Sequence, residues 1–177
     1  IPWIESASAI LDAKQIAQAS PRVIALAFGA EDYTVDMGIQ RTDLGSEMQF
    51  ARSLVPIAAR ASGIVALDTP YVQFKDDQGL ARETKDATTL GYKGKFSIHP
   101  SQLQTINDIF TPKQIDIDYA KRVVNEWETA TAQGKGSLSL DNRMIDVPVV
   151  KRAQALLDMV RQMDQQNRSL PTDVELS

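Results

Sequence analysis

Three short apolar runs lie along the first hundred residues, and each is followed by a carboxylate. The runs are 1–4, 23–28 and 64–67, and the carboxylates are Glu5, Asp32 and Asp68. An apolar run without alternation is typical of a strand buried on both faces of a parallel sheet. Helical patterns separate the runs, and a fourth strand is expected at 95–98. The sequence therefore predicts an α/β fold of about four βα units, whose functional groups gather at the carboxyl ends of the strands.

The pattern changes to consecutive helices after about residue 100. Helices are predicted at 101–110 and 112–133, a small hairpin at 138–146, and a last helix from Pro148. A complete TIM (β/α)8 barrel needs about 250 residues, so four βα units amount to half of one. We expect three segments: a half-barrel over 1–110, a helical extension with the hairpin over 111–163, and a polar tail over 164–177.

The composition excludes several kinds of site. The chain has no cysteine and one histidine, which excludes disulfides, zinc–thiolate sites and multi-histidine metal sites. Any metal must bind to carboxylates, which favours Mg²⁺ or Mn²⁺. The formal net charge is -4 and the basic residues are scattered, so no nucleic-acid partner is expected. We also expect no membrane span, and a cytoplasmic protein.

Glu5 and Asp32 are the most informative carboxylates. Each follows an apolar strand, and one βα unit separates them. Neighbouring parallel strands lie about 4.8 Å apart, so the two side chains can share one ion. The alternative is that both acids cap helix N-termini. Two further residues each have two alternative roles. Asp68 can orient a ligand or bind the following loop, and His99 can act as a base or fix a turn.

Six segments form a set of motifs in a fixed order. They are Pro2-Trp3-Ile4-Glu5-Ser6, Phe28-Gly29-Ala30-Glu31-Asp32-Tyr33, Asp68 through Leu80, Gly91-Tyr92-Lys93-Gly94-Lys95, Ile98-His99-Pro100-Ser101-Gln102 and Met144-Ile145-Asp146-Val147-Pro148. Together they resemble the citrate lyase beta subunit and its relatives in the HpcH/HpaI aldolase group, which includes malyl-CoA and citramalyl-CoA lyases. The resemblance covers about residues 1–163.

This resemblance implies the second half of a TIM barrel followed by a helical extension that makes oligomer contacts in a homotrimer or hexamer. It implies that Glu5 and Asp32 bind Mg²⁺ and that the backbone around Gly29, Ala30 and Glu31 holds the carboxylate of a 2-oxo acid. It also implies that Asp146 reaches the active site of a neighbouring subunit.

The activity implied by the resemblance is cleavage of a carbon–carbon bond in a citryl-type acyl thioester, giving oxaloacetate and an acetyl thioester. The thioester partner is either acyl-CoA or an acyl-carrier protein. Malyl-CoA lyase, citramalyl-CoA lyase or an aldolase on a related 2-oxo acid is the alternative with the same fold. A non-catalytic truncated barrel or assembly subunit is the alternative of another class, because the early strand that carries the family's substrate-binding arginine is missing and Ile1 falls inside a barrel strand.

Overall fold

The fold comes from a computed structural model, which describes residues 1–169. The chain divides into two units, the first over Ile1–Thr111 and the second beginning at Pro112. This division lies one residue from the boundary that the sequence predicts. Each unit has its own buried core.

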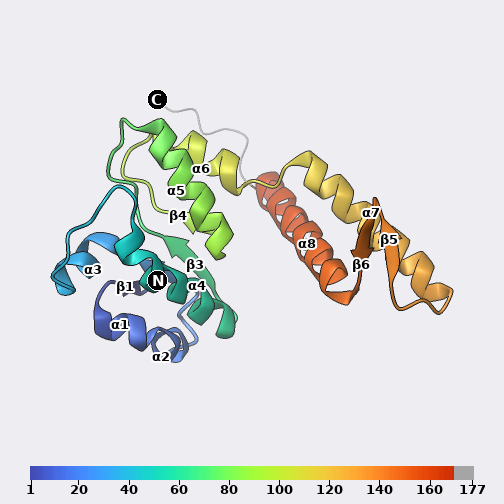
Figure 1. Cartoon of the computed structure of the whole chain (residues 1–177), viewed down its shortest axis with the longest axis horizontal. Coiled ribbons are helices and arrows are strands. Elements are labelled where there is room, and N and C mark those ends of the chain that lie inside the picture. Colours follow the sequence, from blue (N-terminus) through green and yellow to red (C-terminus); the bar gives the residue numbers. More distant parts are fainter. Residues whose placement is uncertain (170–177) are drawn as a thin grey trace. The chain divides into compact units, whose positions relative to one another are not determined.

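The first unit contains a four-stranded parallel sheet with the strand order β1-β2-β3-β4 (Figure 1). The strands are β1 (Trp3–Ile4), β2 (Ala25–Phe28), β3 (Val65–Asp68) and β4 (Gly94–Lys95). An α/β fold with a parallel sheet is therefore confirmed. Because all four strands run in the same direction, their carboxyl ends meet at one edge of the sheet.

The fourth strand is shorter than predicted, because it ends at Lys95 rather than at residue 98. Phe96 still donates its N–H to the carbonyl of Asp68, over 3.0 Å. Beyond it the backbone N–H of Ile98 donates to the side-chain oxygen of Gln102 instead, over 3.0 Å. The N–H of Ile98 thus bonds to a side chain of the following helix and not to a neighbouring strand, so β4 does not continue to residue 98.

The helices of the first unit follow the strands, with two differences from the prediction. They are α1 (Ala7–Leu11), α2 (Ala13–Gln18), α3 (Ala30–Asp36), the 3₁₀ turn η1 (Ser46–Met48), α4 (Gln49–Ala61), α5 (Asp77–Leu90) and α6 (Gln102–Phe110). The first predicted helix is interrupted at Asp12, where α1 ends and α2 begins. The second difference is the short helix α3, which begins directly after β2 and for which no range was predicted; Asp32 lies in its first turn.

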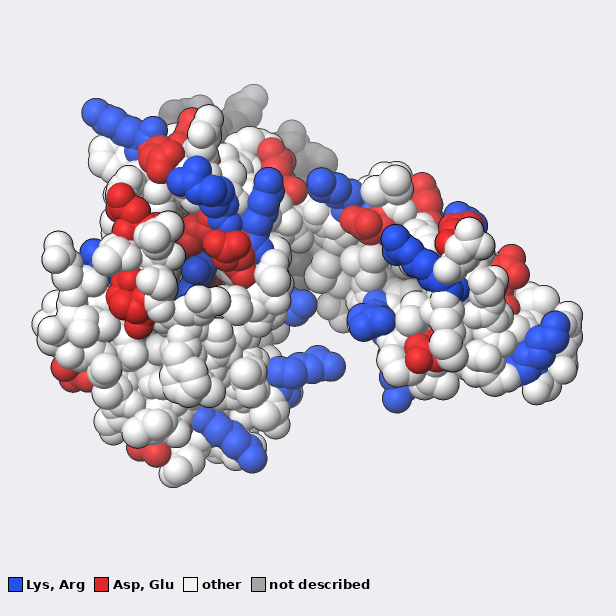
Figure 2. All heavy atoms as spheres, viewed as in Figure 1, with Lys and Arg blue, Asp and Glu red and all other residues white. Residues whose placement is uncertain are grey.

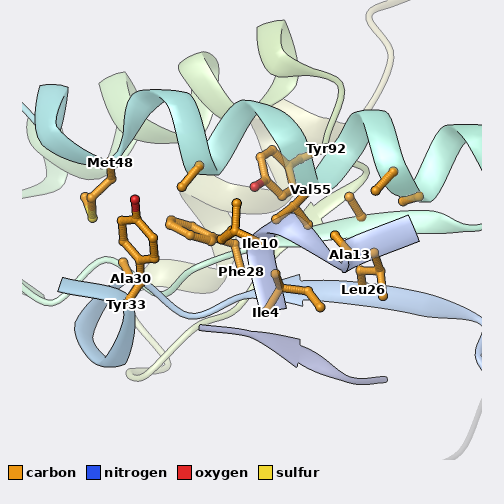
Figure 3. Packing of buried hydrophobic residues seen from close by; sticks show 14 of the residues in the cluster. Ile4, Ile10, Ala13, Leu26, Phe28, Ala30, Tyr33, Met48, Val55 and Tyr92 are labelled. Carbon is orange, nitrogen blue, oxygen red and sulfur yellow. The ribbon is translucent and has the colours of Figure 1, made fainter. Parts of the chain in front are cut away.

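The core of this unit lies between the sheet and helices that include α1 and α4 (Figure 3). Ile4, Leu26 and Phe28 are completely buried against Val55 of α4 and Ile10 of α1. Full burial of one such side chain contributes about 1.5–3 kcal/mol, so this layer fixes the sheet to its helices.

The opposite face of the sheet carries a different row of side chains. Trp3, Ala27, Leu67 and Gly94 occupy matching positions on the four strands. The rings of Trp3 and Phe96 lie 4.6 Å apart, centroid to centroid. On a flat sheet, side chains from the first and fourth strands would stand about 14 Å apart. Their contact shows that the sheet curls toward this face.

The second unit is a helical hairpin with a small β-ribbon. It contains α7 (Gln114–Ala132), β5 (Leu138–Leu140), β6 (Arg143–Ile145) and α8 (Val147–Ser169), and β5 and β6 pair antiparallel. The turn between them has positive φ at Asp141 (50°) and Asn142 (60°), as a two-residue hairpin turn requires. The core of this unit is formed by Ala120, Val123, Ile145, Ala153 and Leu157.

The last helix corrects the expected start of the tail. It continues through residue 164 to Ser169, whereas the prediction began the tail at 164. The remaining part of the predicted tail, 170–177, lies outside the described residues. Within 1–169 no helix is both long enough and apolar enough to cross a membrane.

Candidate metal centre

Glu5 and Asp32 are brought together at the carboxyl edge of the sheet. Glu5 directly follows β1, and Asp32 lies in the first turn of α3, three residues after Gly29. The backbone N–H of Gly29 donates to the carbonyl of Ile4 over 3.1 Å, which ties the start of α3 to the end of β1. The side chains of Glu5 and Asp32 lie within hydrogen-bonding reach of each other, as the strand-end spacing indicates, and their binding of one ion stays a prediction.

Gly29 permits this approach because it has no side chain. A Cβ at this position would lie 2.5 Å from Oε2 of Glu5 and 2.6 Å from its Cβ. Both distances are well below van der Waals contact, so any larger residue would displace Glu5. The glycine of the Gly29–Asp32 segment thus makes room for the first carboxylate, while the segment supplies the second.

The two carboxylates repel each other. Burial, the charge of Asp32 and a hydrogen bond with Asp32 together raise the pKa of Glu5 above its ordinary value of 4.5. Glu5 is partly buried, whereas Asp32 is exposed to solvent. Mg²⁺ usually binds one or two protein carboxylates and keeps positions for water and substrate oxygens. The pair fits such an ion, because a cation would remove the repulsion and the exposed side would leave positions open. In the described part of the chain, no set of three or more acidic or histidine side chains forms a further candidate.

The predicted substrate-binding segment uses two of its backbone donors within the fold. The N–H of Gly29 is bound to Ile4, and the N–H of Ala30 donates to Oγ1 of Thr69 over 3.2 Å. The side chain of Glu31 is mostly exposed and pairs with Arg41 over 2.5 Å. Binding of an oxo acid by this segment stays a prediction, and any such contact has to use donors other than those of Gly29 and Ala30.

A buried cluster of charged side chains lies behind this segment. Asp68 is completely buried and accepts hydrogen bonds from Nε (2.9 Å) and Nη2 (2.7 Å) of Arg52 and from Nζ of Lys95 (2.7 Å). Lys95 also pairs with Glu83 over 2.5 Å and donates to the carbonyl of Thr69 over 2.7 Å. Asp68 is thus the acceptor of a buried ion-pair network, which neither of its two predicted roles describes.

Sequence reasoning missed the cations of this cluster. Burial alone would lower the pKa of Arg52, but its bonds and proximity to Asp68 raise it, so the guanidinium stays charged. One signal was available: Arg52 lies on the buried face of α4, next to Ala51 and Val55. A charged residue on an apolar helix face indicates a buried partner.

The remaining predicted residues lie elsewhere. Asp146 belongs to the second unit, where its Oδ1 accepts from the N–H of Val149 over 3.2 Å and caps α8. The structure therefore assigns it a structural contact, and its catalytic role stays a prediction. His99 is exposed, with Nδ1 2.8 Å from Oγ of Ser101 and its ring stacked on Phe74, which agrees with the turn-fixing alternative.

Comparison with known proteins identifies the family. Residues 1–100 match the family model described as HpcH/HpaI aldolase/citrate lyase. The chain belongs to this family. Among curated members, the citrate lyase subunit beta of Leuconostoc mesenteroides subsp. cremoris is 40% identical over 88% of this chain and 52% of its own length. The L-malyl-CoA/beta-methylmalyl-CoA lyase of Cereibacter sphaeroides is 32% identical over 87% of this chain and 54% of its own length. The chain thus spans about half the length of the curated relatives it matches.

A solved structure of the same family shares the fold. It is that of CitE from Mycobacterium tuberculosis in complex with magnesium, acetoacetate and coenzyme A. It is 29% identical to this chain, with a TM-score of 0.73 over 88% of this chain and 58% of the other. The family therefore comprises carbon–carbon lyases, and a member of known structure binds magnesium.

Proposed function

We propose that this chain provides the metal site of a magnesium-dependent carbon–carbon lyase that cleaves a citryl-type acyl thioester to oxaloacetate and an acetyl thioester. The observation that carries the proposal is the adjacency of Glu5 and Asp32 at the carboxyl edge of the sheet, in a chain of the citrate lyase family. The curl of the sheet supports a second part of the proposal, that the four βα units are the second half of a TIM barrel.

Glu5 and Asp32 would hold Mg²⁺ through their carboxylate oxygens. When bound, the ion acts as a Lewis acid on the oxygen of the oxo-acid product and as a template for its orientation. The adjacent Gly29–Glu31 segment is the proposed binding site of the oxo-acid carboxylate, which would use donors other than the N–H groups of Gly29 and Ala30. Asp32 is exposed, so a substrate can approach the pair from solvent.

Cleavage also needs a proton transfer. A base removes the proton of the substrate hydroxyl, the carbon–carbon bond breaks, and its electron pair passes to the carbon next to the thioester, which is then protonated. We assign this proton handling to Asp146, supplied by the extension of a second subunit in a homotrimer or hexamer. The bond from Val149 holds the Asp146 carboxylate in a fixed orientation at the start of α8.

The metal assignment is tested by ion binding as well as by activity. Mn²⁺ binding to the purified protein is followed by the electron paramagnetic resonance signal of the free ion, and oxaloacetate release from citryl-CoA with Mg²⁺ by a coupled reduction that consumes NADH. We expect Glu5→Gln and Asp32→Asn to abolish Mn²⁺ binding, so that the free-ion signal keeps its full intensity, and to abolish oxaloacetate release. Asp36→Asn, one turn later on α3, is the matched control and should bind Mn²⁺ as the wild type does. Wild-type binding in Glu5→Gln would refute the ligand assignment.

A second candidate keeps the same site and changes the substrate. The 32% identity to L-malyl-CoA/beta-methylmalyl-CoA lyase favours cleavage of malyl-CoA or a related thioester. Assays of citryl-CoA, malyl-CoA, citramalyl-CoA and the free hydroxy acids, each with Mg²⁺, distinguish the two candidates. Turnover of malyl-CoA without turnover of citryl-CoA would replace the first candidate by the second.

A non-catalytic assembly subunit is the alternative of another class. The chain covers only about half the length of each of these relatives. The Glu5/Asp32 pair argues against this alternative. Mn²⁺ binding without turnover of any of these substrates would favour it.

A further inference from the structure

Two successive backbone N–H groups fix the segment that carries the second proposed metal ligand. Gly29 donates to the carbonyl of Ile4 on β1, and Ala30 donates to Oγ1 of Thr69 just after β3. The first bond continues the ladder of the parallel sheet. The second is made by a side chain, at a point where β3 has already ended. The start of α3 is therefore held from both neighbouring strands, and Asp32 lies two residues further on.

The bond to Thr69 lies in the interior of the first unit. Ala30 is completely buried, and Thr69 is 2% exposed. Water cannot readily replace a hydroxyl there, so loss of the Thr69 oxygen would leave a buried N–H without an acceptor. The peptide at Ala30 would then reorient, and the first turn of α3, with Asp32, would move relative to Glu5.

Thr69 is itself held by the buried charged cluster. Its carbonyl accepts from Nζ of Lys95 over 2.7 Å, and the Lys95 side chain has no exposed surface. Lys95 in turn pairs with Asp68 and Glu83. The charged residues of the cluster therefore fix the backbone of Thr69, and the Thr69 hydroxyl fixes the backbone of Ala30.

The same cluster reaches the neighbour of Asp32 by another route. Arg41 lies between Glu83 (3.8 Å) and Glu31 (2.5 Å), so a chain of ion pairs runs from the interior to the residue before Asp32. Acidic and basic side chains of the first unit also lie next to one another on the face shown in Figure 2. Of these two routes from the cluster, the one through Thr69 bonds directly to the backbone of the Gly29–Asp32 segment, and the one through Arg41 ends at the side chain of Glu31.

We propose that Thr69 is a positioning residue for the metal centre: its backbone is held by Lys95, and its hydroxyl sets the orientation of the Gly29–Asp32 segment and so the distance between Asp32 and Glu5. The inference rests on the proposed function, because it concerns the metal ligand Asp32. Residues that orient metal ligands change metal affinity by about 10–100-fold when they are lost.

The experiment uses the whole chain, with Mn²⁺ as the probe. Thr69→Val keeps the shape of the side chain and removes the oxygen, and we expect the Mn²⁺ dissociation constant to rise by about 10-fold or more. Thr69→Ser retains the hydroxyl and should bind Mn²⁺ as the wild type does. The matched control is Thr84→Val, since Thr84 is also a buried threonine of this unit but donates to Leu80 within α5. It should leave Mn²⁺ affinity unchanged.

Amide hydrogen exchange gives a readout that needs no metal. The N–H of Ala30 should exchange faster in Thr69→Val than in the wild type, while the N–H of Gly29, bonded to β1, keeps its rate. If Thr69→Val does not fold, as judged by circular dichroism, Thr69→Ala carries the same expectations.

The outcomes separate the two proposals. Loss of affinity in Thr69→Val, with retention in Thr69→Ser and Thr84→Val, supports the positioning role. If Glu5→Gln abolishes binding but Thr69→Val binds Mn²⁺ normally, the inference is overturned and the proposed function stands. Equal losses in Thr69→Val and Thr84→Val, or an unchanged Ala30 exchange rate, overturn it as well. If the wild type binds no Mn²⁺, the proposed function fails and the inference fails with it.

Discussion

Replacement of Lys95 by methionine should destabilise the first unit strongly. Methionine fills much of the same volume but removes the charge. Three acceptors would lose a donor: Oδ2 of Asp68, Oε1 of Glu83 and the carbonyl of Thr69. Asp68 is completely buried, so water cannot compensate for the missing cation.

The magnitude follows from what remains in the cluster. Removing one partner of a buried ion pair costs about 3–5 kcal/mol, because the other charge is left uncompensated. Here Arg52 still donates twice to Asp68, so we expect the lower end, about 3 kcal/mol. With a slope of about 2 kcal/mol per M, the urea midpoint would fall by about 1.5 M.

The two tryptophans allow the first unit to be observed separately. Trp3 lies in the first unit and Trp127 in the second. In a Trp127→Phe background, fluorescence during urea unfolding reports on Trp3, whose ring lies 4.6 Å from that of Phe96, the residue next to the substitution. The free energy of unfolding comes from linear extrapolation to zero urea.

An exposed lysine two residues earlier provides the control. Lys93→Met removes the same charge from an exposed position and should change the free energy of unfolding by less than about 0.5 kcal/mol. A loss of less than about 1 kcal/mol for Lys95→Met would refute the reasoning, since that is the contribution of an ordinary surface pair.

Two further predictions concern the metal centre. Burial and Asp32 raise the pKa of Glu5 above 4.5, so protons compete with the metal for this carboxylate. The Mn²⁺ affinity should therefore fall as the pH decreases through a midpoint above 4.5. Constant affinity down to that pH would contradict the assignment. Gly29→Ala should displace Glu5, weaken Mn²⁺ binding and cost about 1–3 kcal/mol of stability by overpacking, measured by urea unfolding, whereas Gly136→Ala, which has open space around it, should change neither quantity.

The strands and the carboxylate pair were predictable from local patterns. Continuous apolar runs identify β2 and β3 without knowledge of their partners, and the rule that parallel strands end at one edge brings Glu5 and Asp32 together. The predicted end of β4 was wrong because the N–H of Ile98 donates to the side chain of Gln102 in α6. A local pattern of alternating residues carries no information about such a bond.

The buried cluster and Thr69 could not be predicted from local patterns. Arg52, Asp68 and Lys95 come from three different elements, and nothing in the sequence near each residue specifies the others. In the sequence, Thr69 has no feature that distinguishes it from an ordinary loop residue after a strand. Its contact with Ala30 exists only because the ends of β2 and β3 are neighbours. Contacts of this kind depend on the complete fold.

The pairing of distant segments has a consequence for the order of folding. Each pair in the parallel sheet joins residues far apart in the chain, such as Trp3 with Ala27 and Ala25 with Val65. The ribbon of the second unit pairs Leu140 with Arg143 across a two-residue turn. Local pairings close quickly, whereas nonlocal ones must first overcome the entropy of a long loop. The α7–α8 unit should therefore acquire its structure early, and the two carboxylates should meet only in the last, slow phase of the reaction.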